Sequence, residues 1–398
     1  MPGLLYFGTM DLVKEKIVQA GQLLKEMDID LWLIFVRETM MQADPTIALV
    51  VGHEVVWQSF FAFTSKKDAI ALVGNLDEEN FKKSGRFTEV VSYTSGVKED
   101  FRKLIKRLKP KKIAVNYSSS NPAADGLTHG MYLLLREYLK GTPYVKRLVS
   151  AEDFCTRLRS RKNSAEIKLI KNAALLAHTA WEKAVLEIKP GITEMEIAAI
   201  IDRQIAKQGA TNSFDTIVNA GDKTRPGHGM PTRAKLERGD LLHVDFGARL
   251  DGYCSDLQRL MYFKRPGEKN VPEELTAAFK RVSGIIETAA RKCRPGVKGF
   301  EIDALARTLL TDHGYPEYEH ALGHQLGRDV HDGGAVIGPR WERYGVTPTI
   351  AIEPGNVFTL ELEIMLPGIG CVGLEEDVCV TGRGAKFLCP RQTELIVR

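Results

Sequence analysis

A twelve-residue segment occurs twice in this chain of 398 residues, and the repeat limits the possible folds more than any other feature. The segment KPGITEMEIAAI at 189–200 returns as RPGVKGFEIDAL at 294–305, with its identical residues at one constant offset. Each copy follows a stretch of helical periodicity, and Gly209 or Gly314 ends the helix that the copy begins. Two copies of a helix–helix–strand unit predict a duplicated fold with pseudo-twofold symmetry, in which a ligand would lie between the halves.

The residues before the repeat have a different pattern, an alternation of helical and apolar segments. A helix is expected at 12–27, and strands are expected at 30–35, 69–74, 89–93 and 112–117. This stretch has no cluster of chemically reactive side chains. We therefore predict an α/β amino-terminal domain at 1–155 and an α+β catalytic domain that contains the duplication at 156–398.

The composition is that of an ordinary soluble protein, with 44% hydrophobic residues, 27% charged residues and a formal net charge of +4. The basic runs at 109–112 and 157–162 stand apart and lack interleaved aromatic residues, so nucleic-acid binding is not expected. Residues 1–10 lack the cationic start and apolar core of a signal peptide, and no apolar stretch is long enough for a membrane span, so neither feature is expected. Scattered cysteines without a Cys-x-x-Cys pair indicate reduced thiols, and we expect a cytoplasmic protein.

Two aspartates occupy unusual positions in the stretch HVDFGARLDGYCSD at 243–256. Asp245 interrupts an apolar run where a buried strand would carry Val or Ile, and a buried carboxylate is costly without a compensating cation. The pair Asp251-Gly252 is typical of a hairpin turn. Across such a hairpin, the separation of Asp245 and Asp256 allows both to face the same side. The alternative is that each caps a turn or pairs with Arg249 or Arg259.

Further ligand-type residues follow the second copy of the repeat. ALGHQLGRDVHDGG at 321–334 contains His324 and His331, and two β-rich runs contain the pairs Glu361 with Glu363 and Glu375 with Glu376. Alternation alone does not say which glutamate of each pair faces inward. Four carboxylates and one imidazole match the needs of two adjacent divalent cations, and such ligands favour Mn, Co, Fe or Zn.

These motifs resemble those of the pita-bread metallopeptidases, which include methionine aminopeptidases, prolidases, aminopeptidases P and the non-peptidase creatinase. The resemblance covers residues from about 155 to 398 and rests on DFGARLDGYCSD, GHQLG, VFTLE and GLEEDVCVT. It selects Glu361 and Glu375 from the two pairs. It leaves Glu353, another candidate carboxylate in the segment IEPG at 352–355, outside the ligand set. An amino-terminal domain of this size points to the proline-specific or creatinase branch.

The resemblance also implies a role for each residue. Asp245 would chelate one metal, His324 and Glu361 would bind the other, and Asp256 and Glu375 would bridge the two. Glu361 would also move a proton during hydrolysis. Contact with the substrate would come from two histidines, His228 in RPGHGMP and His331.

Two positions depart from the family pattern. Gly373 stands where proline-specific members usually have Arg, and Gln325 replaces the second glycine of the His324 motif. Arg340 or Arg343, in GPRWERYG at 338–345, is a candidate to supply the missing cation.

The expected activity is hydrolysis of Xaa-Pro dipeptides by a homodimeric enzyme. The short gap between Glu361 and Glu375 resembles that of prolidases. The alternatives are an Xaa-Pro aminopeptidase acting on longer peptides, a creatinase-like enzyme acting on a small non-peptide substrate, and a catalytically inactive binding protein. An inactive protein would be expected to lose ligands, and here the whole set is present.

Overall fold

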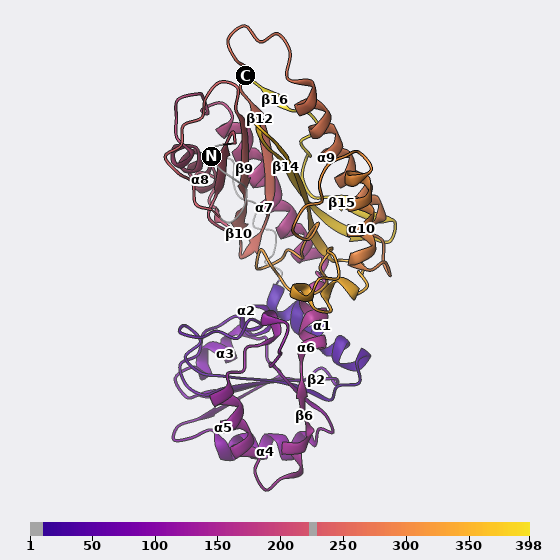
Figure 1. Cartoon of the computed structure of the whole chain (residues 1–398). Coiled ribbons are helices and arrows are strands. Elements are labelled where there is room, and N and C mark those ends of the chain that lie inside the picture. Colours follow the sequence, from indigo (N-terminus) through magenta and orange to yellow (C-terminus); the bar gives the residue numbers. More distant parts are fainter. Residues whose placement is uncertain (1–10, 223–228) are drawn as a thin grey trace. The chain divides into compact units, whose positions relative to one another are not determined.

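The computed structural model describes residues 11–222 and 229–398, and the chain divides into two compact units, Met1–Arg159 and Ser160–Arg398 (Figure 1). Each unit has its own sheet and its own hydrophobic core. Among the described helices, none combines the length and the apolar character of a membrane span.

The first unit is built on a six-stranded mixed sheet with the order β4-β3-β2-β1-β5-β6. Its strands are β1 Leu31–Val36, β2 Ser59–Thr64, β3 Ala69–Gly74, β4 Glu89–Tyr93, β5 Ile113–Val115 and β6 Leu148–Ser150. Its helices are α1 Leu12–Glu26, α2 Ile47–Val50, α3 Glu78–Ser84, α4 Lys98–Leu108, α5 His129–Leu139 and α6 Glu152–Ser160. The expected helix and four expected strands correspond to α1, β1, β3, β4 and β5, whereas β2 and β6 were not expected.

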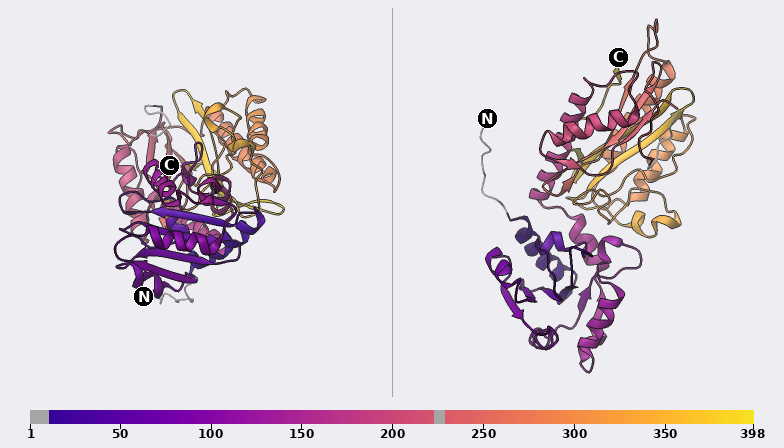
Figure 2. Two further views of the ribbon diagram at one scale, coloured as in Figure 1. Left: turned by 90° about the horizontal axis from the view of Figure 1, so that it is seen from below. Right: turned by 90° about the vertical axis from the view of Figure 1, so that its left-hand side faces the viewer.

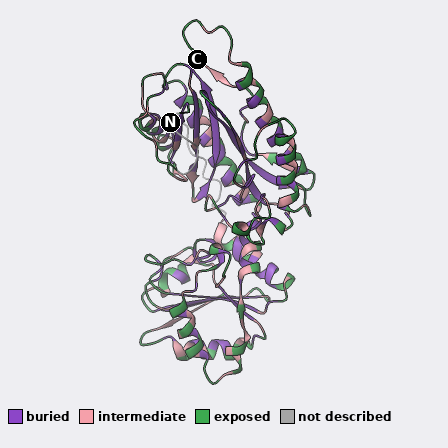
Figure 3. Ribbon diagram, viewed as in Figure 1, coloured by how far each residue is buried: buried purple, intermediate pink, exposed green. Residues whose placement is uncertain are grey.

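Both faces of this sheet are covered. Alternate residues of β1 separate into two cores, with Trp32 packed among residues of α1, α3 and α6 and Leu33 among residues of α4 and α5. Burial on both faces explains why β1, β2 and β3 are continuous apolar runs without polar alternation. Figure 3 shows these strands as buried.

The second unit contains a seven-stranded sheet with the path β13-β14-β12-β9-β8, in which β15 pairs with β14 and β16 with β12. These strands are β8 Ile217–Ala220, β9 Leu241–Phe246, β12 Leu257–Tyr262, β13 Val357–Leu366, β14 Gly370–Thr381, β15 Gly384–Phe387 and β16 Ile396–Val397. A small sheet consists of β7 Thr211–Asn212, β10 Ala248–Leu250 and β11 Tyr253–Cys254. The helices are α7 Ser164–Ala184, α8 Glu194–Ala206, α9 Glu273–Lys292 and α10 Gly299–Thr311.

The sequence repeat produces matching contacts in the two halves of this unit. Glu196 begins α8 by accepting from the backbone N–H of Thr193, and Glu301 begins α10 by accepting from that of Lys298. Isolated bridges join Thr193 to Lys235 and Lys298 to Ala351. The predicted duplication is therefore confirmed, and Figures 1 and 2 show the strands of this unit between the two groups of helices.

The two faces of β13 and β14 have different environments. Leu360, Leu362 and Ile364 belong to the core formed with α9 and α10. Residues of odd number, including Glu361 and Glu375, point to the opposite face because side chains alternate along a strand. The sheet thus separates an apolar core from a row of carboxylates.

The predicted turn at Asp251-Gly252 is confirmed. Both residues have positive φ, 51° and 79°, and Leu250 pairs directly with Tyr253. Positive φ at both central positions matches the type I′ turn of two-residue hairpins. Since the pairing keeps one register from β9 to β12, the turn determines how the two aspartates meet.

Two glycine substitutions should change stability in opposite directions. Gly252→Ala forces a Cβ into a left-handed turn and should lower the unfolding free energy by about 1–2 kcal/mol. Gly284→Ala, in the exposed interior of α9 with open space around it, should raise the unfolding free energy by up to about 1 kcal/mol. Denaturant unfolding measures both, and shifts of equal sign would contradict the assigned backbone conformations.

Candidate metal centre

One row of polar side chains crosses four adjacent strands of the second unit. Asp245 on β9 pairs with Gln258 on β12, Gln258 pairs with Glu375 on β14, and Glu375 pairs with Glu361 on β13. Asp256 lies two residues before Gln258 and faces the same side, where it contacts Asp245. The register of the sheet therefore gathers four carboxylates on one face.

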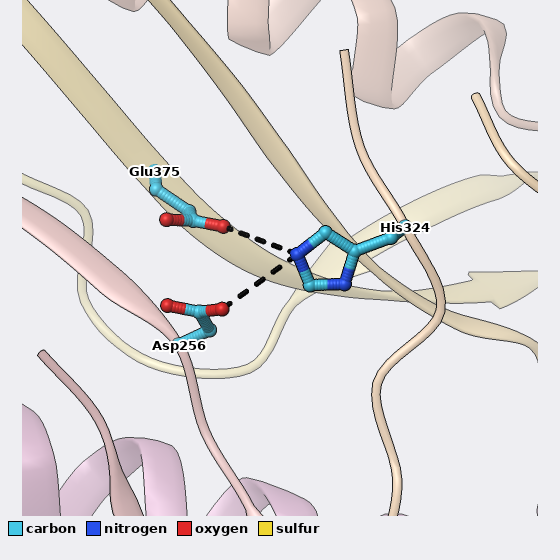
Figure 4. A group of neighbouring side chains, drawn as sticks. All are labelled: Asp256, His324 and Glu375. Carbon is cyan, nitrogen blue, oxygen red and sulfur yellow. Dashed lines mark ion pairs between the residues drawn. The ribbon is translucent and has the colours of Figure 1, made fainter. Parts of the chain in front are cut away.

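His324 completes the cluster from the segment between α10 and β13. Its Nε2 lies 3.7 Å from Asp256 Oδ2, 3.9 Å from Glu361 Oε1 and 4.0 Å from Glu375 Oε1. Figure 4 shows the imidazole pointing between Asp256 and Glu375. The backbone carbonyl of His324 accepts from the N–H of Thr359 at 3.0 Å, which fixes this segment against β13.

The cluster has the form of a cation site. One ligand atom from each of Asp256, His324 and Glu375 lies within 4.8 Å of the others. Three buried oxygens of the predicted ligand residues have no hydrogen-bond partner: Asp245 Oδ1, Asp256 Oδ1 and Glu375 Oε1. Buried oxygens without donors are costly, and a divalent cation would satisfy all of them. The residues present thus fit a metal.

Burial and mutual repulsion change the acidity of the cluster. Burial, with the charge of Glu363, raises the pKa of Asp245 to about 7, and burial with the charge of Asp245 raises that of Glu361 to about 8. Burial and neighbouring carboxylates also raise the pKa of Asp256 and of Glu375 well above their ordinary values. A bound divalent cation would favour the ionised forms of all four.

The imidazole has the opposite shift. Burial, with His331 beside it, lowers the pKa of His324 to about 3. The ring is therefore neutral near pH 7, and neutral imidazole is the form that binds metals.

Buried polar contacts anchor the segment that carries the histidines. The Lys162 ammonium lies 3.0 Å from an Asp332 carboxylate oxygen, with both side chains almost fully buried, and donates to Gln325 Oε1 at 3.3 Å. Gln325 in turn donates to Ser160 Oγ at 3.0 Å. Gln325, which departs from the family pattern, thus serves to fix the residue next to His324.

The predicted substrate-contacting residues differ in their placement. His331 is exposed and meets the His324 ring edge-on, with 4.2 Å between centroids. Arg340 stacks on Phe300, and Arg343 donates to the carbonyl of Glu319; both arginines are exposed. His228 lies outside the described residues.

The neighbouring glutamates have other partners. Glu376 pairs with Arg259 at 3.0 Å on the opposite face, and both are almost fully buried. Arg161 binds the carboxylate of Glu353. Glu363 lies across from Gly373 in the strand pair and faces the same side as Glu361.

Sequence reasoning missed three polar residues at this site. Gln258 and His243 lie in phase with the two aspartates on their strands, and Asp377 accepts from the backbone N–H of Asp256 at 3.2 Å. A polar residue two positions from each aspartate in an apolar strand was the signal that could have identified Gln258 and His243.

The stability of the metal-free protein should depend on pH. Asp245 and Glu361 keep their protons in the folded state up to about pH 7 and 8, but release them near 3.8 and 4.5 when the chain unfolds. Because the folded state binds more protons across this window, its melting temperature should fall as the pH rises from about 5 to 8.

The stabilisation that a bound metal provides should depend on pH in the opposite direction to the stability of the metal-free protein. The increase in melting temperature caused by a divalent cation should grow over the same pH range, since protons compete with the metal. Thermal scans with and without Mn²⁺ measure both trends, and the Asp245→Asn variant should show a weaker dependence. A pH-independent melting temperature of the metal-free protein would contradict this account.

Comparison with known proteins agrees with this geometry. Residues 168–382, more than half of the chain, match the model of Metallopeptidase family M24. The chain is 28% identical to the Xaa-Pro dipeptidase of Pyrococcus horikoshii, over 97% of this chain and 100% of that protein. The solved structure of a Xaa-Pro dipeptidase from Bacillus anthracis has a TM-score of 0.76 at 27% identity, covering 97% of this chain and 100% of that one. That of an X-Pro aminopeptidase from Thermotoga maritima has a TM-score of 0.74 at 26% identity, covering 96% and 99%. Through its matched residues and its pita-bread fold, the chain belongs to metallopeptidase family M24.

Proposed function

We propose that this protein is a metal-dependent Xaa-Pro dipeptidase. The observation that carries the proposal is the cluster of four carboxylates and one neutral imidazole, with oxygens that lack hydrogen-bond partners. Asp256 and Glu375 are buried in it, and Asp245 and Glu361 are partly buried. The Xaa-Pro dipeptidase from Pyrococcus horikoshii, to which 97% of this chain is similar, supports the substrate class. The second unit would be the catalytic domain.

The cluster would hold two divalent metals. Asp245 would bind one metal, His324 and Glu361 the other, and Asp256 and Glu375 would bridge them. The mixture of hard oxygens and one imidazole favours Mn, Co, Zn or Fe. The orphaned oxygens on both Asp245 and Asp256 support a second cation beside the group formed by Asp256, His324 and Glu375.

The side chains of this chain would divide the work of hydrolysis. When bound, divalent cations polarise a peptide carbonyl and make a water acidic enough to attack at neutral pH. Glu361 would take the proton of that water and deliver it to the leaving nitrogen. His331 and His228 would donate hydrogen bonds to the carbonyl oxygen as it gains charge.

Two further expectations complete the proposal. The protein would be a homodimer, as its family suggests, and it would be cytoplasmic, as its free cysteines suggest. Arg340 or Arg343 would bind the carboxylate of a dipeptide, for which Gly373 offers no side chain. The exposure of both arginines supports their access to a ligand.

Adjacent glutamates on β14 offer a matched test of the metal site. Glu375→Gln should remove at least one equivalent of metal and reduce turnover by more than the about 100-fold typical of losing an outer partner of a ligand. Glu376→Gln should leave the metal content unchanged but lower the unfolding free energy by about 3 kcal/mol, because Arg259 loses its buried partner. Elemental analysis measures the metal content per chain of both variants and of the unchanged protein. A content of one metal or none in the unchanged protein would refute the dinuclear site.

A substrate panel tests the activity. The metal-reconstituted protein should hydrolyse Xaa-Pro dipeptides faster than an Xaa-Pro tripeptide, and should not act on creatine. Replacing Arg340 and Arg343 together with Ala should raise KM for a dipeptide more than for its carboxyl-amidated analogue. Preference for the tripeptide would favour an aminopeptidase, and no Xaa-Pro cleavage with any metal would refute the proposed activity.

A further inference from the structure

Gln258 is the one uncharged member of the row formed with Asp245, Glu375 and Glu361, and its side chain is buried to 7% exposure. Its Nε2 donates to Glu375 Oε2 at 3.0 Å and to Glu361 Oε2 at 3.2 Å. The other oxygen of each glutamate, Oε1, faces His324 Nε2 at 4.0 and 3.9 Å. A single amide group thus holds one oxygen of each glutamate and leaves the other directed toward the histidine.

A second set of contacts fixes the orientation of this amide. Once a bound cation has ionised both carboxylates they can only accept, so the amide nitrogen of Gln258 faces them, and Oε1 faces His243 Nε2 at 3.0 Å. His243 therefore carries its proton on Nε2. Its Nδ1 lies 3.1 Å from Asn219 Oδ1, and both residues are buried. Since that ring nitrogen then has no proton, a hydrogen bond there requires the Asn219 amide to turn its nitrogen toward the ring. Asn219, His243 and Gln258 form a buried chain that ends on the two glutamates.

This chain requires a glycine at position 373. A Cβ added there would lie 2.7 Å from His243 Nε2 and 2.8 Å from Gln258 Oε1, closer than real Cβ contacts. Two hydrogen-bonded side chains therefore fill the space that a side chain at position 373 would need. The absence of the usual arginine at position 373 therefore goes together with the presence of Gln258 and His243, because their side chains occupy its space.

We propose that Gln258 is a positioning residue, held by His243 and Asn219 in the space left by Gly373, that aims Glu361 and Glu375 at the metal. The inference rests on the proposed metal-dependent function. An amide has two N–H groups, one for each carboxylate, so the two glutamates are oriented together. Without these donors each carboxylate can rotate, and ordering it again opposes metal binding.

The test is a comparison of two buried glutamines in the full-length protein. Gln258→Met keeps the length and bulk of the side chain but removes both donors. It should weaken Mn²⁺ and Co²⁺ binding by about 10–100-fold in chelator competition, and reduce the rise in melting temperature that these metals cause. Gln392→Met is the matched control, because Gln392 is buried to 8% exposure and bonds the backbone of Leu260 instead. It should lower stability and leave metal affinity within about twofold of the unchanged protein.

Gly373→Ala provides an independent route to the same effect. Its Cβ should displace Gln258 and His243 and weaken metal binding, and its combination with Gln258→Ala should cost less than the sum of the separate losses. Unchanged metal affinity in Gln258→Met, with a loss of stability like that of the control, would overturn the proposal. Failure of the unchanged protein to bind metal would instead refute the proposed function, and that measurement is independent of the variants.

Discussion

The mutual repulsion of buried carboxylates is the constraint that the second unit is built around. Asp245, Asp256, Glu361 and Glu375 share one face of a sheet, and burial raises the pKa of each. An unpaired buried ion costs several kcal/mol, so this arrangement needs a cation or protons to exist. The apolar core under α9 and α10, on the other face of β13 and β14, supplies the packing that holds the strands in register.

The duplicated halves contribute unequally to the cluster. The hairpin of β9 and β12 brings Asp245 and Asp256, whereas the second half brings His324, Glu361 and Glu375. Strands β12 and β14 pair at Gln258 and Glu375. Two residues further along β12, the backbone of Leu260 pairs with a side chain. The Gln392 amide accepts from the Leu260 N–H and donates to the Leu260 carbonyl, as the backbone of a neighbouring strand would do. Gln258 thus stands where the two halves join, which is why one side chain there reaches glutamates on two strands of the other half.

Much of this architecture could be predicted from the sequence, because it depends on local patterns. The repeat predicts the duplication, Asp251-Gly252 predicts the hairpin, and apolar runs predict most strands of the first unit. The strand β2 was missed because periodicity alone does not distinguish a short, fully buried strand from a buried helical segment. The contacts of Gln258 with Glu361 and of Lys162 with Asp332 join residues far apart in the chain, so they depend on register that no local pattern contains.

Contacts within the second unit explain how the two departures from the family pattern, Gln325 and Gly373, fit into the fold. Gln325 accepts from Lys162 and donates to Ser160, and Gly373 makes room for His243 and Gln258. The same contacts limit where a cation for the substrate can come from. Lys162 is held by Asp332 and Gln325, and Arg259 is bound to Glu376, so each buried cation already has buried partners. These two buried cations therefore keep the frame of the site in place, and the exposed Arg340 and Arg343 stay the proposed partners of a charged substrate group.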